Sequence, residues 1–330
     1  MTNPRVLCIG EILFDLISDQ PGVPYDQVTS WTAYPGGAPA NVACALEKLG
    51  TPAGFVGCVG EDEPGNSLVD LLQTIGVNTA GVQRHDTAPT REIYVIRTPE
   101  GDRQFVGFGD RDTTEFADTQ LQASQLPVDL FAVAEFLVMG TLEMPYPTTA
   151  AAIHRALDLA DQHEVKIVLD VNWRHMFWPD PDAAKPVIRS LMPRIDFLKL
   201  SDEEASWLFD TTDPGVITYR LENLEGVLVT AGDKGCAYCL SGQEGTFPAY
   251  QVEVEETTGA GDGFLAGLVH QLCAGGIKHL SDPGHARQVV AYASAVGALT
   301  TTRPGAIAAQ PTAAEVEAFL YLNRDQTHGS

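Results

Sequence analysis

The chain has 330 residues and carries 20 Lys and Arg against 44 Asp and Glu, so its formal charge at pH 7 is −24. Apolar residues make up 44% and charged residues 19%, which is the composition of a globular protein of one or two domains rather than of a disordered chain. The acidity repels nucleic-acid backbones and anionic lipid, and no cluster of Lys or Arg offsets it. We therefore expect neither nucleic acid nor a membrane as a partner.

No apolar segment reaches the length of about 18 residues that a transmembrane helix needs, and Glu11 and Asp15 interrupt the most apolar N-terminal segment. We expect a cytoplasmic protein whose six cysteines are reduced. Cys236 and Cys239 are three positions apart in a strand-like run, so their side chains point to opposite faces. No second Cys or His pair completes a tetrahedral set, and we expect no zinc site.

Apolar runs of strand length alternate with segments of helical period, which is typical of parallel strands joined by crossover helices. The first predicted strand is 6–9, and the helix 38–49 leads to the strand 53–59. Further strands are predicted at 136–139, 166–171, 197–200 and 226–230, with helices at 148–162, 183–191, 202–209 and 217–224. A hairpin-like segment at 236–254 follows, and then helices at 261–274, 286–299 and 313–322.

Two segments, 13–34 and 91–109, interrupt this alternation, and the second is typical of a hairpin with its turn at 98–102. We expect a small β-sheet built from about 13–34 and 91–112. This sheet would be inserted in a single α/β domain that spans 1–330, and would lie as a lid over the carboxyl ends of the strands.

The strongest local signal is the glycine-rich turn Glu256-Thr-Thr-Gly-Ala-Gly-Asp-Gly-Phe264, which leads directly into an apolar helix. Gly259, Ala260 and Gly261 would present backbone N–H groups at the helix N-terminus, where the helix dipole favours an anion. Asp262, in the first turn, is placed to take a proton from an attacking hydroxyl. The alternative is a plain glycine turn with Asp262 as an ordinary first-turn residue.

A second glycine turn, Pro35-Gly-Gly-Ala-Pro-Ala-Asn-Val-Ala43, also opens a helix, and Asn41 lies near its start. Paired glycines let a ligand touch the backbone, and the Asn amide can both donate to and accept from hydroxyl groups. By itself this segment could be only a tight entry turn. Neither turn has the sequence of a P-loop, and no dinucleotide-binding glycine pattern follows the first strand.

Seven motifs follow one another along the chain: 10–15, 35–43, 57–62, 170–174, 199–204, 229–235 and 256–264. Together they resemble the PfkB (ribokinase-like) carbohydrate kinase family over about residues 5–322. The run Gly-Gly-Ala-Pro-Ala-Asn, the segment 60–65 and Trp178 are most similar to plant- and cyanobacterial-type fructokinases. The resemblance implies a ribokinase-like three-layer α/β/α fold with a mostly parallel central sheet and a small β-sheet lid.

The resemblance also implies a role for each matching position. Asp262 would be the catalytic base, which takes the proton of the sugar's primary hydroxyl as that hydroxyl attacks the γ-phosphate of ATP in line, while Gly259, Ala260 and Gly261 hold the phosphoryl oxygens. Glu204 would organise water around Mg²⁺. The expected substrate-binding residues are Asp15, Gly36, Gly37, Asn41, Arg174 and Arg111, and the expected nucleotide-binding residues are Ser201, Thr230, Gly232, Gly235 and Ser294.

Three elements depart from the family pattern. The run Phe105-Val-Gly-Phe-Gly-Asp-Arg-Asp112 replaces a Phe-Tyr-Arg-like run that is common in plant members, and Arg111 is the candidate substitute for its Arg. Ser201 stands where the family's Asn-x-x-Glu element has Asn, and a helix N-cap is an equal alternative for it. Glu256 stands where the family has Asp in an element that helps to bind a monovalent cation in many members, so potassium activation stays open.

We expect a cytoplasmic, magnesium- and ATP-dependent sugar kinase of carbohydrate metabolism, which converts D-fructose and ATP to fructose 6-phosphate and ADP. The alternatives are 2-keto-3-deoxygluconate kinase or another PfkB sugar kinase within the class, and a catalytically silent sugar-binding regulatory protein outside it. The partners would be small molecules, with a homodimer formed through two lids if the lid exposes an apolar face.

Overall fold

Two β-sheets form the frame of the molecule. Over residues 3–99 and 103–324, which the computed structural model describes, a nine-stranded sheet has the order β13-β12-β11-β10-β9-β8-β1-β4-β5, and a four-stranded sheet has the order β3-β2-β6-β7. In the large sheet the strands from β11 to β5 in this order pair in parallel. Strand β12 pairs antiparallel with β11, and β13 pairs antiparallel with β12. Its strands are β1 (Val6–Ile9), β4 (Ala53–Gly60), β5 (Asn78–His85), β8 (Phe136–Met139), β9 (Lys166–Asp170), β10 (Phe197–Ser201), β11 (Gly226–Thr230), β12 (Cys236–Leu240) and β13 (Gln243–Phe247).

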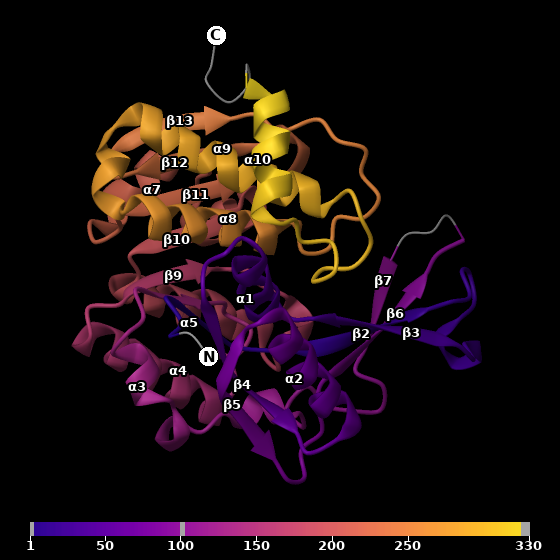
Figure 1. The fold of residues 1–330 in the computed structure, drawn as a ribbon. Helices are drawn as coiled ribbons and strands as arrows, with labels where there is room; N and C mark the ends of the chain where they lie inside the picture. Colours follow the sequence, from indigo (N-terminus) through magenta and orange to yellow (C-terminus); the bar gives the residue numbers. More distant parts are fainter. Residues whose placement is uncertain (1–2, 100–102, 325–330) are drawn as a thin grey trace.

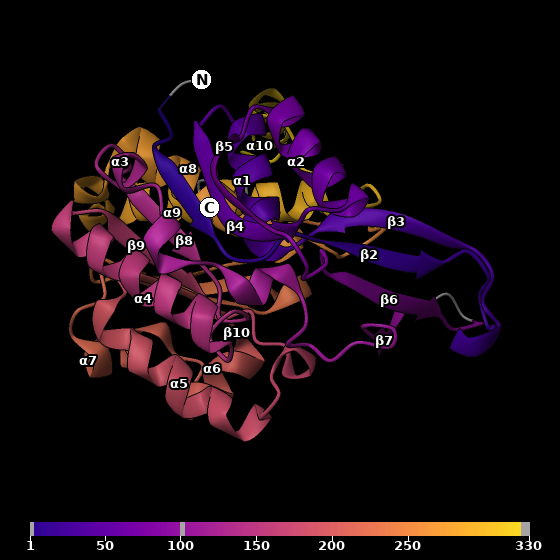
Figure 2. The same cartoon turned by 90° about the horizontal axis from the view of Figure 1, so that it is seen from below.

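Helices cover both faces of the large sheet, as Figures 1 and 2 show. In β1, Val6 and Cys8 belong to one hydrophobic core and Leu7 and Ile9 to the other, because successive side chains of a strand point to opposite faces. One face packs against α1 (Ala38–Lys48), α2 (Glu63–Ile75), α8 (Ala260–Gly275), α9 (Pro283–Thr300) and α10 (Ala313–Leu322), and the other against α4 (Pro147–Gln162), α5 (Ala184–Leu191), α6 (Asp202–Phe209) and α7 (Pro214–Leu221). The predicted three-layer α/β/α class is confirmed.

The predicted elements agree with this structure to within one residue except in the places described here. Helix α9, predicted at 286–299, begins three residues earlier because Asp282 caps it and accepts the backbone N–H of His285 at 2.7 Å. Helix α7 begins three residues before the predicted start because Asp213 caps it and accepts the backbone N–H of Gly215 at 2.9 Å. The predicted hairpin ends with β13 at Phe247 instead of continuing to 254. Helix α2 and strand β5 were not predicted, although Asp62 followed by a proline near the helix start is an N-terminal signal.

The small sheet consists of β2 (Leu13–Ser18), β3 (Trp31–Gly36), β6 (Glu92–Arg97) and β7 (Arg103–Gly107). Strand β2 pairs in parallel with β6, so the two interrupting segments meet in one sheet, which projects from the body in Figures 1 and 2. Ile17 and Ile93 lie on its buried face. Strands β6 and β7 form the predicted hairpin, and residues 100–102 of its predicted turn lie outside the described residues.

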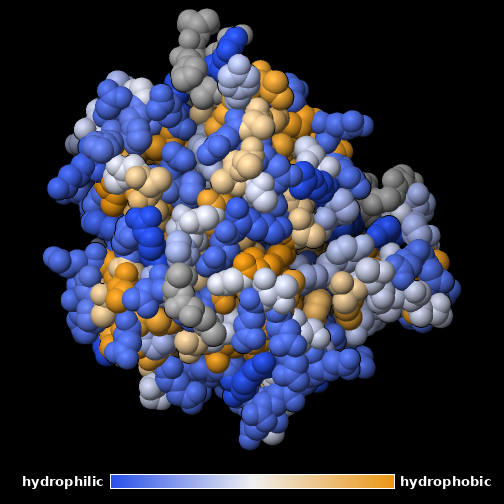
Figure 3. Space-filling view, in the orientation of Figure 1, coloured by the Kyte–Doolittle hydropathy of each residue, from blue (hydrophilic) through white to orange (hydrophobic). Residues whose placement is uncertain are grey.

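The molecular surface agrees with the acidic composition. The face in Figure 3 is mostly hydrophilic, with small scattered hydrophobic areas. Among the described residues, every helix is too short or too polar to cross a bilayer.

Candidate active site

The topology of the large sheet directs the polar motifs toward one edge. Strand β1 lies between β4 and β8, so the chain continues to one side of β1 first and to the other side later. Open α/β sheets bind ligands at such a switch point, beside the carboxyl ends of the strands on either side of it. Asp170, Ser201 and Thr230 lie at the carboxyl ends of β9, β10 and β11, and the small sheet begins directly after β1.

Asn41 and Asp262 meet at this edge, although 221 residues separate them. Asn41 lies in α1 and donates from Nδ2 to Oδ2 of Asp262 at 2.8 Å. Burial raises the pKa of Asp262 to about 6; the Asn41 hydrogen bond opposes this shift, and the Asp170 charge adds to it. A carboxylate with a pKa of about 6 is charged at neutral pH and can still accept a proton, as a general base requires.

The predicted anion-binding turn forms the N-terminus of α8. Gly259 is the N-cap with φ of +79°, a conformation that favours glycine, and it packs against Ala306. Ala260 donates its N–H to the carbonyl of Thr257 at 3.2 Å, so this one of the three predicted donors is already engaged. In the part of the chain that the structure describes, the N–H groups of Gly259 and Gly261 have no protein acceptor. These two groups are therefore available to an anion.

A buried cation that the sequence analysis did not predict stands against this turn. Lys199 on β10 is 8% exposed, and its Nζ donates to Oδ2 of Asp170 at 2.7 Å. A Cβ at Gly261 would lie 2.9 Å from that Nζ, so glycine at this position lets the ammonium group lie directly against the turn. Burial alone would lower the pKa of Lys199, but the Asp170 carboxylate raises it above its ordinary value. The turn therefore combines a helix N-terminus with a buried ammonium group that an aspartate stabilises.

The sugar-binding positions implied by the resemblance lie where β3 meets α1. Gly37 is the N-cap of α1 with φ of +102°, and a Cβ there would lie 2.5 Å from the carbonyl oxygen of Glu11. Gly36 faces Asp15, whose Oδ2 would lie 3.2 Å from a Cβ at this position. Burial raises the pKa of Asp15 to about 6, while the charge of Arg103 lowers it. Asp15 therefore lies close enough to Arg103 of the small sheet for the two charges to interact.

Ser201 and Glu204 form a capping box at the N-terminus of α6. Ser201 Oγ accepts the N–H of Glu204 at 3.1 Å, and Glu204 Oε2 accepts the N–H of Ser201 at 2.8 Å. Glu204 Oε1 accepts the N–H of Trp173 at 2.8 Å. Burial, followed by the Asp170 charge, raises the pKa of Glu204. Ser201 is therefore the N-cap of α6, which is the role given above as its alternative. The N–H groups of Ser201 and Trp173 hold the Glu204 carboxylate near the carboxyl end of β10.

Three of the expected nucleotide-binding residues lie at or just after the end of β11. Thr230 ends that strand, and Gly232 and Gly235 belong to the turn that leads into β12. Ser294 is half-buried on α9, a helix that packs along α8. No ligand contact tests these four positions, and their roles stay predictions.

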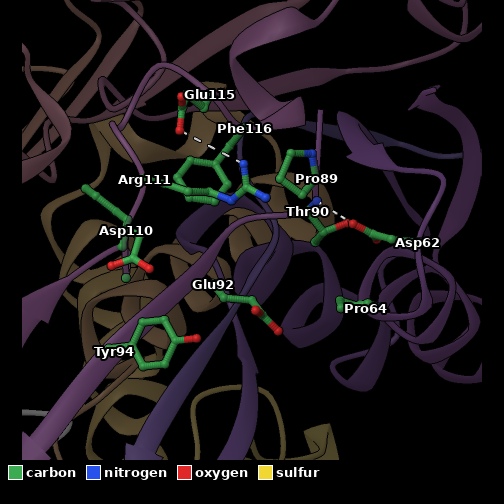
Figure 4. Close-up of a pocket in the computed structure, with 12 residues that line it drawn as sticks. Asp62, Pro64, Pro89, Thr90, Glu92, Tyr94, Asp110, Arg111, Glu115 and Phe116 are labelled. Carbon is green, nitrogen blue, oxygen red and sulfur yellow. Dashed lines mark hydrogen bonds and ion pairs between the residues drawn. The ribbon is translucent and has the colours of Figure 1, made fainter. Parts of the chain in front are cut away.

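The two arginines expected at the substrate differ in placement. Arg174 is exposed, and its charge lowers the pKa of Asp262. Arg111 lines a cleft of about 460 Å³ with Glu92, Tyr94 and Phe116, which Figure 4 shows. Among the described residues, no hydrogen bond or ion pair joins Arg111 to Asp15 or Asp262; it lies 4.0 Å from the Glu115 carboxylate. Substrate binding by Arg111 stays a prediction.

Among the charged residues of this region, Lys199, Asp170 and Arg103 are three that the sequence analysis left without a role. The sequence does contain a signal for two of them. Lys199 lies within the apolar run 197–200, and Asp170 directly follows the run 166–169, as expected of buried polar groups in parallel strands. Arg103 gave no such signal, because charged residues are common near hairpin turns.

Comparison with known proteins identifies the family of the chain. The model of the pfkB family of carbohydrate kinases matches residues 3–313. Probable fructokinase-5 of Arabidopsis thaliana is 35% identical over 321 residues, which cover 96% of this chain and 98% of the relative.

Two solved structures share the fold closely. The ATP-bound fructokinase of Xylella fastidiosa superimposes with a TM-score of 0.86 at 28% identity, covering 97% of this chain and 98% of that one. A fructokinase double mutant of Vibrio cholerae, with fructose, ADP and potassium bound, gives a TM-score of 0.81 at 25% identity and covers 97% of this chain and 99% of that one. The resemblance seen in the sequence is confirmed, and the chain belongs to the pfkB family of carbohydrate kinases.

Proposed function

We propose that this carbohydrate kinase is a fructokinase, which transfers the γ-phosphoryl group of ATP to the primary hydroxyl of D-fructose. The observation that carries the proposal is the contact of Asn41 with Asp262 at the N-terminus of α8, beside the buried Lys199. This arrangement brings together the amide of Asn41, which can bind hydroxyl groups, the carboxylate of Asp262, which can accept a proton, and a site for an anion. The fructokinases of Arabidopsis and Xylella support the choice of sugar.

In the proposed reaction, a bond forms between the sugar oxygen and the γ-phosphorus as the bond from that phosphorus to ADP breaks. The hydroxyl proton passes to Asp262. The free N–H groups of Gly259 and Gly261, together with Lys199, stabilise the charge on the phosphoryl oxygens, because donors already in place need no rearrangement as the charge develops.

Fructose would be held by the residues between β2 and α1. Asn41 is 4% exposed, and its Oδ1 has no partner among the described residues, so one amide acceptor remains for a sugar hydroxyl. The half-buried Asp15 adds a carboxylate that accepts from hydroxyl groups. We propose that the small sheet acts as the lid that encloses the sugar, since it carries Asp15 on the face that points to the body.

The residues present fit Mg²⁺ bound chiefly through phosphate and water. In the segments 3–99 and 103–324, no three His, Cys, Asp or Glu side chains are grouped so that they could hold a metal ion. Glu204 is an anchored carboxylate whose remaining lone pairs can orient such water. When bound with ATP, Mg²⁺ neutralises charge on the phosphates. We propose that potassium is not needed at Glu256, because Nη1 of Arg103 lies 2.6 Å from its Oε1 and the N–H of Gly305 donates to its Oε2.

We also propose a homodimer formed through the small sheets. On the face opposite Ile17 and Ile93, Trp31 packs against Tyr94 and Tyr25, with ring centroids 5.1 Å and 5.8 Å apart. A half-buried aromatic cluster on a projecting sheet is a candidate for a symmetric contact. Light scattering should give about twice the chain mass, and Trp31→Asp should give a monomer. A wild-type particle of 35.4 kDa would contradict the dimer.

The location that we propose is the cytoplasm. All six cysteines are buried and free, as expected for a protein in a reducing compartment.

The function is tested by measuring ADP release with MgATP and a panel of fructose, glucose, ribose, adenosine and 2-keto-3-deoxygluconate. We expect one strong response, to fructose, and its loss in Asp262→Asn. A strong response to another sugar would retain the mechanism and replace the substrate. Folded protein that binds ATP and fructose but releases no ADP would instead support the silent regulatory protein.

A further inference from the structure

Glu256 joins two distant parts of the molecule. Its Oε1 lies 2.6 Å from Nη1 of Arg103, and its Oε2 accepts the N–H of Gly305 at 3.1 Å. Its own N–H donates to the carbonyl of Thr301 at 3.1 Å. The Glu256 side chain is only 13% exposed, so its negative charge is poorly hydrated and needs a cationic partner.

Arg103 supplies that partner from the small sheet. It lies on β7, and Figure 1 shows this end of the sheet beside the orange connection that leads from β13 to α8. The same Nη1 donates to Oγ1 of Thr258 at 3.0 Å. Thr258 directly precedes Gly259, so one guanidinium group holds two residues at the entrance to the anion-binding turn.

We propose that Arg103 is a positioning residue for phosphoryl transfer: through Glu256 and Thr258 it sets the Gly259–Gly261 turn when the small sheet lies against the body, and it supplies the positive charge that Glu256 requires. The inference rests on the proposed kinase function. It implies that closure of the sheet over the sugar and order in the phosphate-binding turn are coupled through one side chain. It also implies that a monovalent metal ion is not needed at Glu256, since a guanidinium group already neutralises it.

The first experiment needs no turnover. We compare hydrogen exchange of the amides of 257–263 in the wild type, Arg103→Met and Arg97→Met, all without ligand. Arg97 is the matched control because it pairs with Arg103 in the register of β6 and β7, and no ion pair to the body is found for it among the described residues. We expect faster exchange only in Arg103→Met. Unchanged exchange in that variant overturns the proposal, whether or not the chain phosphorylates fructose.

The second experiment measures fructose phosphorylation at constant ionic strength in potassium chloride and in tetramethylammonium chloride. The wild type should have the same kcat in both salts. Arg103→Met should lose about 10²-fold in kcat with a smaller change in the KM for ATP, because a displaced turn affects the transition state most. Low concentrations of guanidinium chloride, or potassium, should restore part of the loss, and Arg103→Lys should retain part of the activity.

Two results would contradict the proposal in this assay. One is a wild type that requires potassium, because the charge at Glu256 would then come from the ion. The other is an Arg103→Met variant whose kcat matches that of Arg97→Met in every salt. A wild type that phosphorylates none of the sugars refutes the proposed function alone, and the exchange experiment still decides the role of Arg103.

Discussion

Replacing Asp262 with Asn should lower kcat by a factor on the order of 10²–10⁴, the range typical of the loss of a general base. The amide keeps the shape of the side chain but cannot accept the hydroxyl proton. Steady-state ADP release with fructose measures the loss.

The control for this variant is its ability to fold and to bind ATP. Asp262 lies in the first turn of α8 and contacts Asn41 through one hydrogen bond, so the substitution should leave the melting temperature and the calorimetric Kd for ATP close to those of the wild type. A variant with wild-type kcat would show that Asp262 is not the base. An active-site role for Asn41 would then need another explanation.

The pH profile of kcat/KM tests the same assignment. Burial raises the pKa of both Asp262 and Asp15 to about 6. Both must be ionised, so kcat/KM should be constant above about pH 7 and fall below pH 6 with a slope steeper than one. The variant Asp15→Asn should retain a slope of one. A wild-type midpoint near 4, the ordinary value of an aspartate, would contradict a buried base.

Lys199→Met should produce the second large effect, a loss of about 10²–10³-fold in kcat, which is typical when a preorganised charge or donor is removed from a transition state. The loss follows from the position of its Nζ against Gly261. The charge of Lys199 lowers the pKa of Asp262, so the acid limb of kcat/KM should also move to higher pH in this variant.

Stability must be separated from catalysis here, because Lys199→Met leaves the buried Asp170 without its cation. Breaking a buried ion pair costs about 3–5 kcal/mol of unfolding free energy. The double variant Lys199→Met/Asp170→Asn removes both charges and should recover most of that stability without recovering kcat. Recovery of both quantities together would show that Lys199 is only a structural residue. Chemical denaturation and ADP release measure the two effects.

The local elements of the large sheet could be predicted because their signals are local. Strand β1 is an uninterrupted apolar run, and α10 begins at a Thr with Glu three residues later, the pattern of a capping box. Strand β5 lacked such a signal. Its burial alternates irregularly, and its sequence Asn78–His85 mixes polar and apolar residues, because it is the edge strand of the large sheet.

The candidate site was predictable in its glycines and less so in its charges. Gly37 and Gly259 occupy left-handed conformations at helix starts, which the residue type itself indicates. The partners of Lys199 and Arg103 could not be predicted, because they depend on which strand lies beside which. Lys199 meets Asp170 only because β9 and β10 are neighbours with these two residues opposite each other.

The sequence by itself therefore determined the parallel strands and their crossover helices, the two glycine turns and the family resemblance, since each depends on the order of residues within a short segment. Only the tertiary structure decided that Asn41 meets Asp262 across 221 positions, that Lys199 stands against Gly261, and that Arg103 reaches Glu256 from the small sheet. Such contacts follow from burying both faces of the large sheet and docking the small one, and these are properties of the whole chain.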